Sequence, residues 1–394
     1  MPHDVARNEV KLLAREMGFD AVAVASAGPL LRGDAAVARV RQGLMDGLPW
    51  FTEERARRAS RPGELLPGAR SVISVAMSYT APAATRPESG LRGKVARYAR
   101  GEDYHRVMKR RLKSLVEALE RRAGRPVRAR IFVDDGPMLD RAAAEAAGVG
   151  WFGKNTLIVT PGLGSWVFLG QAVTDLELEQ DTPLRKSCGS CHICMDRCPT
   201  GAIVASYVVD NRRCISFLTI ENRGPIPVEL RPLVGDWVFG CDICQEVCPV
   251  NRKAAPTREA AFYVRNGGMS TLDLVGLLDM SEAEYQERFR GSAIKRARRV
   301  GLQRNACVAL GNLRDPAAVP ALTRALQHGE PLVRGHAAWA LGRIGGGAAR
   351  RALEQSLVRE ENIYVRQEIE AALGESAVAA VSSGRAPSAQ RCEV

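Results

Sequence analysis

The spacing of its cysteines constrains this chain more than any other feature of the sequence. Eight of the ten cysteines fall between residues 188 and 248, in two runs. The first run reads Cys188-Gly-Ser-Cys191-His-Ile-Cys194-Met-Asp-Arg-Cys198-Pro199, and the second consists of Cys214 followed by Cys241-Asp-Ile-Cys244-Gln-Glu-Val-Cys248-Pro249. A C-x2-C-x2-C-x3-C-P run is typical of bacterial two-cluster ferredoxins. The spacing therefore predicts a module that holds two [4Fe-4S] clusters.

The same pattern predicts which cysteines share a cluster, because the fourth cysteine of each run binds the other cluster. One cluster is expected to bind Cys188, Cys191, Cys194 and Cys248, and the other Cys198, Cys214, Cys241 and Cys244. Structural zinc is the alternative, since paired C-x2-C spacings also make four-cysteine zinc sites. Zinc ribbons, however, rarely add a third cysteine two residues on or a trailing Cys-Pro.

Three further candidate ligands fall outside this assignment. Cys307 lies in a helical repeat and Cys392 in the C-terminal tail, and both are interpreted as ordinary thiols. His192 lies inside the first cysteine run but is interpreted as a surface residue rather than a ligand.

Composition and length indicate a globular protein of two or three domains. Hydrophobic residues make up 46% and charged residues 25% of the 394 positions, close to the averages of soluble domains. The N-terminal residues resemble an amphipathic helix and a strand rather than an export signal, and no apolar run approaches the roughly 20 residues that span a membrane. We therefore expect a cytoplasmic protein with reduced thiols and no membrane contact.

The net charge of +12 and the pI near 9.5 favour a polyanionic partner. The alternative is an arginine-rich composition without such a partner. A dense basic run, Lys295-Arg-Ala-Arg298-Arg299 followed by Arg304, suits contacts to phosphate groups, although a plain charged helix face has the same composition.

Before the cysteines, helical and strand patterns alternate over about 180 residues, which indicates an α/β domain at 1–180. Strands are expected at 68–79 and 128–135. Helices are expected at 102–120, with Asp103 as N-cap, and from Met138 to Ala147.

After the cysteines, the segments ALGNL (309–313) and ALGRI (340–344) announce a helical repeat whose units begin at Arg304, Arg334 and Arg366. Short HEAT-like repeats stacked into an α-solenoid are expected, and such solenoids usually bind macromolecules. The arginine at the head of each unit either lines the binding surface or is a salt-bridged structural position. We favour binding, and add Arg334 to Lys295, Arg298, Arg299 and Arg304 as candidate nucleic-acid contacts.

The predicted fold is therefore a multidomain α+β protein. Its parts are the α/β domain at 1–180, a ferredoxin-like two-cluster module at 181–255, a linker and HEAT-like repeats at 256–375, and a flexible tail at 376–394.

This order of parts, together with three distinctive segments, resembles the epoxyqueuosine reductases, iron–sulfur and cobalamin enzymes of tRNA queuosine synthesis. The segments are RYARGEDYH (97–105), VDDGPMLDRAAAEAAGVGWFGKN (133–155) and CISFLT (214–219). The ferredoxin spacing alone is shared with many redox proteins, whereas its combination with the 133–155 segment and the repeats is much more specific.

The resemblance implies reduction of the epoxide on the modified wobble base of a tRNA anticodon stem-loop to an alkene, with loss of the oxygen as water. The reaction takes two electrons and two protons, and the clusters supply electrons singly. In the family the aspartate of the VD pair donates a proton, which carries over to Asp134. Asp135 departs from the family pattern, where a small residue is frequent, and a capping or turn pair is the structural alternative for both aspartates.

Cobalamin is implied by the resemblance and not by composition or spacing. Asp103-Tyr104-His105 begins like the D-x-H-x-x-G signature of a histidine-ligated corrinoid, but Met108 occupies the glycine position, so a helix cap is favoured. Cobalamin is expected without a protein histidine below the cobalt. The expected contacts are Asp134, Asn155, Thr156, Ser165 and Ser216, with Arg57 and Arg58 matching a family arginine approximately.

Two other functions are alternatives to this one. A corrinoid reductive dehalogenase shares the cofactors, but such enzymes usually carry a twin-arginine export signal and lack a helical solenoid. A non-catalytic iron–sulfur electron carrier or RNA-binding protein is the third reading. For the leading function we expect a monomer that receives electrons from a donor the sequence does not identify.

Overall fold

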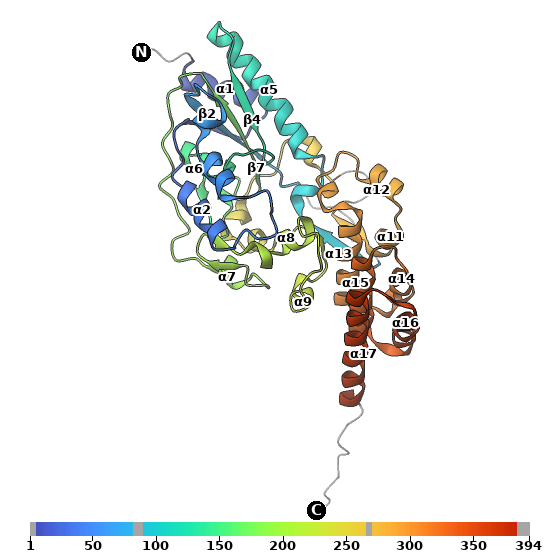
Figure 1. Cartoon of the computed structure of the whole chain (residues 1–394). Helices are drawn as coiled ribbons and strands as arrows, with labels where there is room; N and C mark the ends of the chain where they lie inside the picture. Colours follow the sequence, from blue (N-terminus) through green and yellow to red (C-terminus); the bar gives the residue numbers. More distant parts are fainter. Residues whose placement is uncertain (1–4, 82–89, 265–269, 384–394) are drawn as a thin grey trace, which may run out of the picture.

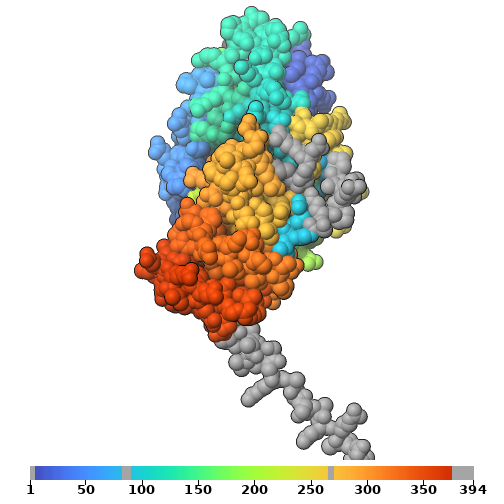
Figure 2. Space-filling view, turned by 90° about the vertical axis from the view of Figure 1, so that its right-hand side faces the viewer, coloured from blue at the N-terminus to red at the C-terminus, as the bar shows by residue number. Residues whose placement is uncertain are grey.

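The computed structural model describes residues 5–81, 90–264 and 270–383, and their side chains up to residue 374. An N-terminal domain built on a β-sheet lies at one end and a helical solenoid at the other, with the cysteine-rich module beside the first and in contact with the second (Figures 1 and 2). Among the described residues, no helix is long and apolar enough to cross a membrane.

The N-terminal domain contains a four-stranded sheet in the order β1-β2-β7-β4. Its strands are β1 (Ala21–Ser26), β2 (Ser71–Ser78), β7 (Val167–Thr174) and β4 (Ala129–Phe132). Each neighbouring pair is antiparallel. The expected strands at 68–79 and 128–135 are present as β2 and β4. The alternation of helices and strands here gives an antiparallel sheet rather than parallel βαβ units.

Helices cover both faces of this sheet. Helices α1 (Arg7–Glu16) and α5 (Tyr104–Ala123) pack on one face, and α6 (Asp140–Ala147) packs on the other (Figure 1). Every side chain of β2 is buried. Because successive side chains of a strand point to opposite faces, Ile73, Val75 and Met77 join the core under α5, while Val72 joins the core under α6.

Helix α5 begins as the sequence predicts. The side chain of Asp103 accepts the backbone N–H of His105 at 3.1 Å, which is an N-cap bond. Asp103 also holds the His105 ring, whose Nδ1 lies 2.7 Å from its carboxylate. The interpretation of Asp103-Tyr104-His105 as a helix cap is confirmed.

A second, three-stranded sheet joins segments that the sequence assigns to three different domains. Its order is β10 (Trp237–Phe239), β3 (Arg92–Val95), β11 (Thr271–Asp273). The strand β3 from the N-terminal region pairs in parallel with β10 of the cysteine-rich segment and antiparallel with β11 of the linker. The parts are therefore interleaved through this sheet.

The cysteine-rich segment folds into short elements around its loops. They are α7 (Ile193–Asp196), β8 (Ile203–Ala205), β9 (Val208–Val209), α8 (Ile215–Ile220), α9 (Arg231–Val234), α10 (Ile243–Glu246) and the 3-10 helix η3 (Pro249–Lys253). Around the N-terminal sheet lie α2 (Gly33–Arg41), α3 (Glu53–Ala59), α4 (Pro62–Leu65), and the hairpin of β5 (Trp151–Phe152) and β6 (Ile158–Val159).

The C-terminal part is a two-layer stack of helices. After α11 (Leu274–Asp279) and α12 (Glu282–Arg288), the solenoid consists of α13 (Arg298–Leu313), α14 (Val319–Ala325), α15 (Pro331–Ile344), α16 (Gly346–Arg359) and α17 (Ile363–Ser383). Helices α13, α15 and α17 pack in sequence as one layer, and α11, α14 and α16 form the other. The expected helical repeat is confirmed. Helix α17 continues to Ser383, so the tail expected from 376 begins later, and the rest of it, with Cys392, lies outside the described residues.

The arginine that recurs at the head of each repeat unit is structural. Arg304 is 1% exposed, and its guanidinium donates to the carbonyls of Leu218, Asn222 and Gly224 and to the side chain of Asn305. These bonds use all five of its N–H donors. The prediction that Arg304 contacts phosphate is therefore wrong.

The two later arginines fill comparable positions. Arg334 makes a bidentate ion pair with Glu360, at 2.7 and 2.8 Å, and bonds the carbonyl of His328. Arg366 donates to the carbonyls of Leu357 and Glu360. Each arginine thus ties loops of the stack together, and Arg334 is not free to bind nucleic acid as the sequence suggested.

Candidate functional site

The eight cysteines of the two runs gather in two sets. All are partly buried free thiols. The pKa of Cys194 is raised by burial and by the neighbouring thiols of Cys188, Cys248 and Cys191. Since such an effect requires proximity, these four side chains are neighbours. The described residues include no group of three or more His, Cys, Asp or Glu side chains placed to hold a single metal ion.

The second set lies deeper. Burial raises the pKa of Cys244 to about 12, and the thiols of Cys214, Cys194 and Cys198 add to the shift. Burial also raises the pKa of Cys241, with further contributions from Cys244 and Cys214. Because thiols of both sets raise the pKa of Cys244, the two sets are adjacent.

Cys214 reaches the second set from the start of a helix. It is the N-cap of α8, and although burial raises its pKa, hydrogen bonds from the backbone N–H groups of Phe217 and Ser216 lower it. Helix N-terminal N–H groups favour a thiolate over a thiol. The CISFLT segment therefore supplies a candidate ligand together with the donors that stabilise its ionised form.

Two of the predicted cofactor contacts lie against this second set. The side chain of Asn155 hydrogen-bonds the thiol of Cys244 and accepts the N–H of Leu157 at 3.3 Å. Ser216 contributes its N–H to Cys214. Thr156 adopts a left-handed φ of 67°, and its carbonyl accepts from Arg141 at 3.2 Å. Arg141 in turn lowers the pKa of Cys214 by its charge, so Thr156 belongs to the same neighbourhood.

The predicted acid, Asp134, stands in a strained turn at the end of β4. Its φ is 56°, a conformation that aspartate tolerates better than most residues. The side chain is exposed, and its Oδ2 accepts a hydrogen bond from the hydroxyl of Tyr104 at 2.9 Å. The Tyr104 ring stacks on Phe168 with centroids 4.3 Å apart. Asp135 instead forms an ion pair with Lys109, so the two neighbouring carboxylates have different partners.

Tyr98 joins the Asp134 turn to the second thiol set. Burial raises its pKa well above the usual range, and the charges of Asp134 and then Asp242 raise it further. Asp242 lies between Cys241 and Cys244 and accepts the backbone N–H of Arg97 at 2.7 Å. The second set is therefore the one that lies near Asp134.

Asp140 is a buried carboxyl beside the turn that sequence reasoning did not single out. Its Oδ1 is buried without a hydrogen-bond partner. Burial, and then the charges of Asp134 and Asp135, raise its pKa well above the usual range. Gln171, fully buried in β7, donates to the backbone carbonyl of Asp140 at 3.1 Å, and its own Oε1 also lacks a partner. In the sequence, the signal for this carboxyl is the aspartate of the LDRA segment (139–142).

Ser165, predicted beside the cofactor, is part of a buried network between the N-terminal domain and the module. Its hydroxyl donates to Gln245 at 3.1 Å and accepts from Asn251 at 2.9 Å. Tyr79 donates to the same Gln245 oxygen at 3.2 Å. The hydroxyl of Ser165 thus helps fix the module against the sheet.

The predicted arginine pair lies on α3. Arg57 is exposed and pairs with Glu53 at 2.8 Å, and Arg58 is also exposed. Arg55, two residues earlier, instead donates to the carbonyl of Gly136 at 3.0 Å and lies over the ring of Trp50. Of these three arginines, Arg55 is the one that contacts the Asp134 turn.

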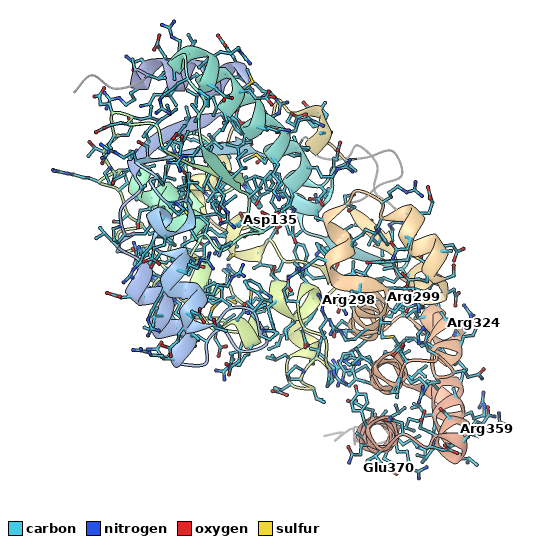
Figure 3. The ribbon with its side chains drawn as sticks, turned by 45° about the horizontal axis from the view of Figure 1, so that its top comes forward. Asp135, Arg298, Arg299, Arg324, Arg359 and Glu370 are labelled. Atoms are coloured by element: carbon cyan, nitrogen blue, oxygen red, sulfur yellow. The ribbon has the colours of Figure 1, made fainter. Side chains whose placement is uncertain are left out.

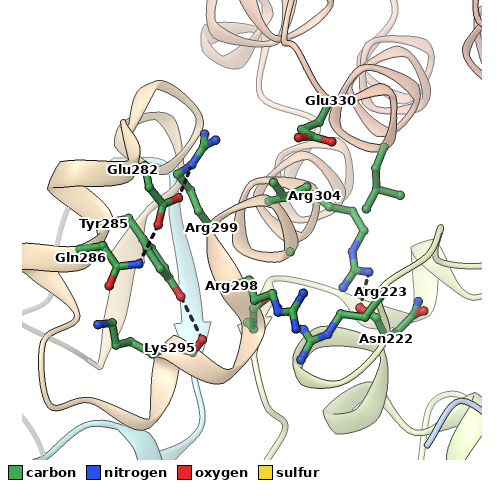
Figure 4. Close-up of a pocket in the computed structure, with 14 residues that line it drawn as sticks. Asn222, Arg223, Glu282, Tyr285, Gln286, Lys295, Arg298, Arg299, Arg304 and Glu330 are labelled. Atoms are coloured by element: carbon green, nitrogen blue, oxygen red, sulfur yellow. Dashed lines mark hydrogen bonds and ion pairs between the residues drawn. The ribbon is translucent and has the colours of Figure 1, made fainter. Parts of the chain in front are cut away.

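The basic run lines a cavity of about 500 Å³ where the module meets the linker and the solenoid (Figure 4). Lys295, Arg298 and Arg299 all line it, together with Arg223 of the module. Arg299 pairs with Glu282 at 3.0 Å. Arg298 is exposed and points beside Arg223, whose pKa is lowered by burial and then by the charges of Arg298 and Arg296. Because cations outnumber acids in the lining of this cavity, the cavity favours an anionic ligand.

The basic run and the Asp134 turn face each other. Figure 3 shows Asp135 on the side of the N-terminal domain nearest the solenoid, and Arg298 on the solenoid side nearest that domain. Arg296 makes a bidentate pair with Glu221, at 2.7 and 3.0 Å. The charge of Asp134 also contributes to raising the pKa of Arg296, after the Glu221 bond. The basic run therefore begins within electrostatic reach of Asp134.

Comparison with known families gives three matches along the chain. Residues 59–135 match the family model of epoxyqueuosine reductase QueG, DUF1730. Residues 187–251 match the 4Fe-4S double cluster binding domain, and residues 290–374 match HEAT repeats.

Curated relatives extend the similarity over most of the chain. An epoxyqueuosine reductase of Xanthomonas campestris is 41% identical over 351 residues, covering 87% of this chain and 97% of the relative. One from Pseudomonas aeruginosa is 42% identical over 354 residues, covering 87% of this chain and 96% of the relative.

Solved structures agree with these relatives. A crystal structure of epoxyqueuosine reductase with an epoxyqueuosine-modified tRNA-Tyr stem loop matches with a TM-score of 0.88 and 33% identity, covering 94% of this chain and 98% of the other. An epoxyqueuosine reductase from Bacillus subtilis, with a catalytic aspartate loop swung out of the active site, matches with a TM-score of 0.86 and 33% identity, covering 93% of this chain and 98% of the other.

Proposed function

The chain belongs to the epoxyqueuosine reductase family, and from that membership we propose that it reduces the epoxide of epoxyqueuosine at the wobble position of tRNA to give queuosine. It is an oxidoreductase with two [4Fe-4S] clusters, a ferredoxin-like module and HEAT-like repeats. The observation that carries the proposal is the match of nearly the whole chain to a reductase whose structure holds an epoxyqueuosine-modified tRNA stem loop.

We assign the clusters to the two thiol sets. The outer cluster binds Cys188, Cys191, Cys194 and Cys248, and the inner cluster binds Cys198, Cys214, Cys241 and Cys244. The grouping of thiols by their mutual effect on pKa supports this assignment. Eight thiolates in two sets of four suit two cubane clusters.

Asp134 is the proton donor in this proposal. Its exposed carboxyl lies in the turn after β4, next to Asp135, which Figure 3 places on the side nearest the solenoid, and the hydroxyl of Tyr104 fixes its orientation through the 2.9 Å bond. Tyr104 itself is held by its stacking on Phe168. A rigidly held acid within hydrogen-bond reach of the leaving oxygen is what general acid catalysis requires.

Cobalamin is the cofactor that the family implies, and part of the predicted contact set fits it. Asn155, Thr156 and Ser216 lie beside the cysteines assigned to the inner cluster, so polar groups are available next to that cluster. We propose that these three residues hold cobalamin, with Asp134 facing it. Ser165 is engaged elsewhere, and Arg55 is a better candidate than Arg57 or Arg58. When bound, cobalamin supplies the redox chemistry that opens the epoxide.

We propose that Lys295, Arg298 and Arg299 contact tRNA phosphates. They line one basic cavity with Arg223, and the neighbouring Arg296 lies within electrostatic reach of Asp134. A stem gripped at this point can present its unstacked wobble base to the Asp134 turn. Arg304 and Arg334 are excluded from this set because their guanidiniums are bound internally.

Localisation, oligomeric state and domain boundaries complete the proposal. We propose a cytoplasmic monomer with domains at 1–180, 181–255 and 256–375. A reductive dehalogenase or a non-catalytic carrier is not favoured, since the relatives that share most of this chain are epoxyqueuosine reductases.

The decisive experiment is product analysis. Anaerobically reconstituted protein with cobalamin, a chemical reductant and epoxyqueuosine-containing tRNA should yield queuosine nucleoside, which has lost one oxygen atom, by liquid chromatography and mass spectrometry. Omission of cobalamin is the control. If protein that retains both clusters and binds cobalamin leaves the epoxide intact, the proposed reaction is wrong.

A further inference from the structure

The outer cluster's cysteines lie on a surface that differs in chemistry from the Asp134 side. Figure 1 shows α7, which contains Cys194, on the side of the molecule away from α14 and α16. Helix α7 packs against α10, and η3 follows α10. The surface formed by residues 185–197 and 249–253 is called the α7/η3 face below.

Two exposed apolar side chains lie on this face. Ile193 is 41% exposed and immediately precedes Cys194. Val250 is 42% exposed and follows Cys248 by two positions. Because α7 and η3 both contact α10, these two apolar residues lie on neighbouring elements, beside cysteines assigned to the outer cluster.

Cations are frequent on this face. The exposed ones are Arg185, Lys186, Arg197, Arg252 and Lys253. Lys154 also reaches the first cysteine loop, where it donates to the carbonyl of Gly189 at 2.9 Å. The acids nearby have partners, since Asp196 contacts His192 at 3.3 Å and Glu246 contacts Arg97 at 3.2 Å.

This pattern is that of a protein interface rather than a phosphate groove. Protein docking sites combine an apolar centre with a charged rim, and complementary charge accelerates their association. A nucleic-acid backbone is charged and offers no apolar surface to pack against Ile193 and Val250. A redox partner bound to this face would contact residues that lie next to the proposed outer-cluster ligands in the sequence.

We propose that the α7/η3 face is the docking site of an acidic protein that carries one electron at a time, of the flavodoxin or small-ferredoxin class. This inference rests on the proposed function for its direction of electron flow. In each encounter the reduced carrier loses one electron, and the outer [4Fe-4S] cluster goes from the 2+ to the 1+ state. No bond breaks and no proton is required. A second encounter supplies the second electron of the epoxide reduction.

The test measures cluster reduction without tRNA, so that it is independent of the proposed reaction. Clusters are reconstituted anaerobically, and their bleaching is followed by stopped flow with reduced, acidic flavodoxin as donor. Reduced methyl viologen, a small cation, is the second donor. The variant is Arg252→Glu with Lys253→Glu, and its matched control is Lys113→Glu with Arg121→Glu on α5, where both residues are exposed and lie far from α7. Iron content is checked for each protein.

We expect the Arg252→Glu/Lys253→Glu protein to be reduced by flavodoxin about 10-fold or more slowly at low ionic strength, since electrostatic steering changes association rates by about 10- to 1,000-fold. Its flavodoxin affinity, measured by surface plasmon resonance, should fall and lose salt dependence. Methyl viologen should reduce it no more slowly than the wild type, and the control variant should behave as wild type with both donors.

A second variant tests the apolar side chains of this face without changing charge. Val250→Ser should weaken flavodoxin binding and leave viologen reduction unchanged. The proposal is overturned if flavodoxin reduces and binds both variants at wild-type levels. It is also overturned if the charge variant loses tRNA binding instead, because the face would then belong to the nucleic acid.

Discussion

The hydroxyl of Tyr104 donates a 2.9 Å hydrogen bond to Oδ2 of Asp134. The tyrosine comes from the first turn of α5 and the aspartate from the turn after β4, so two separate elements set the orientation of the proposed acid. Asp135, the next residue, pairs with Lys109 instead. The structure thereby distinguishes two carboxylates that the sequence places side by side.

Replacement of Tyr104 by Phe should lower turnover while binding is retained. The ring would keep its stacking on Phe168, and only the hydrogen bond to Asp134 would be lost. A hydrogen bond to a charged group is worth about 1.5–3 kcal/mol, so we expect the single-turnover rate to fall by about 10-fold or more. Tyr263→Phe, which removes a weak 3.4 Å bond to Thr257, is the control. An unchanged rate in Tyr104→Phe would mean that the tyrosine does not position the acid.

Replacement of Asp134 by Asn should remove most activity. General acid catalysis contributes on the order of 100- to 10,000-fold, and Asn retains the size of the side chain without its proton. Asp135→Asn, which breaks only the surface pair with Lys109, should retain most of the rate. Queuosine formation under single-turnover conditions is the measurement, with tRNA affinity as the check on binding. If Asp135→Asn is the inactive variant, the proton comes from the other carboxylate.

Replacement of Cys214 by Ala should damage one cluster. Wild-type protein should contain about eight irons from two four-iron clusters, and the variant about four. Cys307→Ala is the matched control, because that thiol is buried in α13 and makes only a long 3.9 Å contact to the carbonyl of Val333. Iron and sulfide analysis with electron paramagnetic resonance spectra distinguishes the two variants. Two intact clusters in Cys214→Ala would refute the ligand assignment.

Replacement of Lys295, Arg298 and Arg299 together by Ala should weaken tRNA binding and reduce its salt dependence. Each lost phosphate contact removes roughly one released counterion from the slope of log affinity against log salt, so the slope should fall by up to about three. Arg304→Ala is the contrasting variant. It leaves the carbonyls of Leu218, Asn222 and Gly224 without a donor and should lower the melting temperature. If the triple variant binds tRNA with wild-type affinity and slope, the cavity does not hold phosphate.

Replacement of Asp140 by Asn should change the pH dependence of stability. Burial and the charges of Asp134 and Asp135 raise the pKa of Asp140 well above its ordinary value. The folded state therefore holds a proton that the unfolded state releases above pH of about 4. Stability from this group is complete below the unfolded pKa and is lost as pH rises towards the folded pKa.

Asn cannot ionise, so the melting temperature of Asp140→Asn relative to wild type should increase as pH is raised from about 4. Differential scanning calorimetry over that range is the measurement. Asp279→Asn, at an exposed ion pair with Arg324, is the control. A difference that stays constant with pH would show that Asp140 is ionised in the folded protein.

Much of the site could be predicted because its signals are local. A cysteine run predicts a double-cluster module from spacing alone, and residues 187–251 match the 4Fe-4S double cluster binding domain. The cap at Asp103 depends on the next two residues alone. The strand β2 was visible as an apolar run because both of its faces are covered.

Local patterns do not show where a side chain lies when its partners are far away in the sequence. In the sequence, Arg304 looks like one more cation of the basic run. In the structure it is buried, and the carbonyls that accept its hydrogen bonds belong to residues 218–224. Arg57 and Arg55 lie in the same short helix, and its seven residues carry too little periodicity to tell which arginine faces the Asp134 turn. Ser165 is fixed by Gln245 and Asn251, a pairing across the domain boundary that no local pattern reveals.

The burial of Arg304 and Asn305 also bears on the order in which the protein is made. Helix α13 holds the carbonyls of Leu218, Thr219 and Val238, and these residues belong to the elements that carry Cys214 and lead to Cys241. A chain leaves the ribosome from its N-terminus, so the thiols of the inner cluster emerge before the helix that braces them. We therefore expect the surroundings of the proposed inner cluster to be complete only after α13 has been synthesised, which would make its final enclosure a late step for the nascent chain.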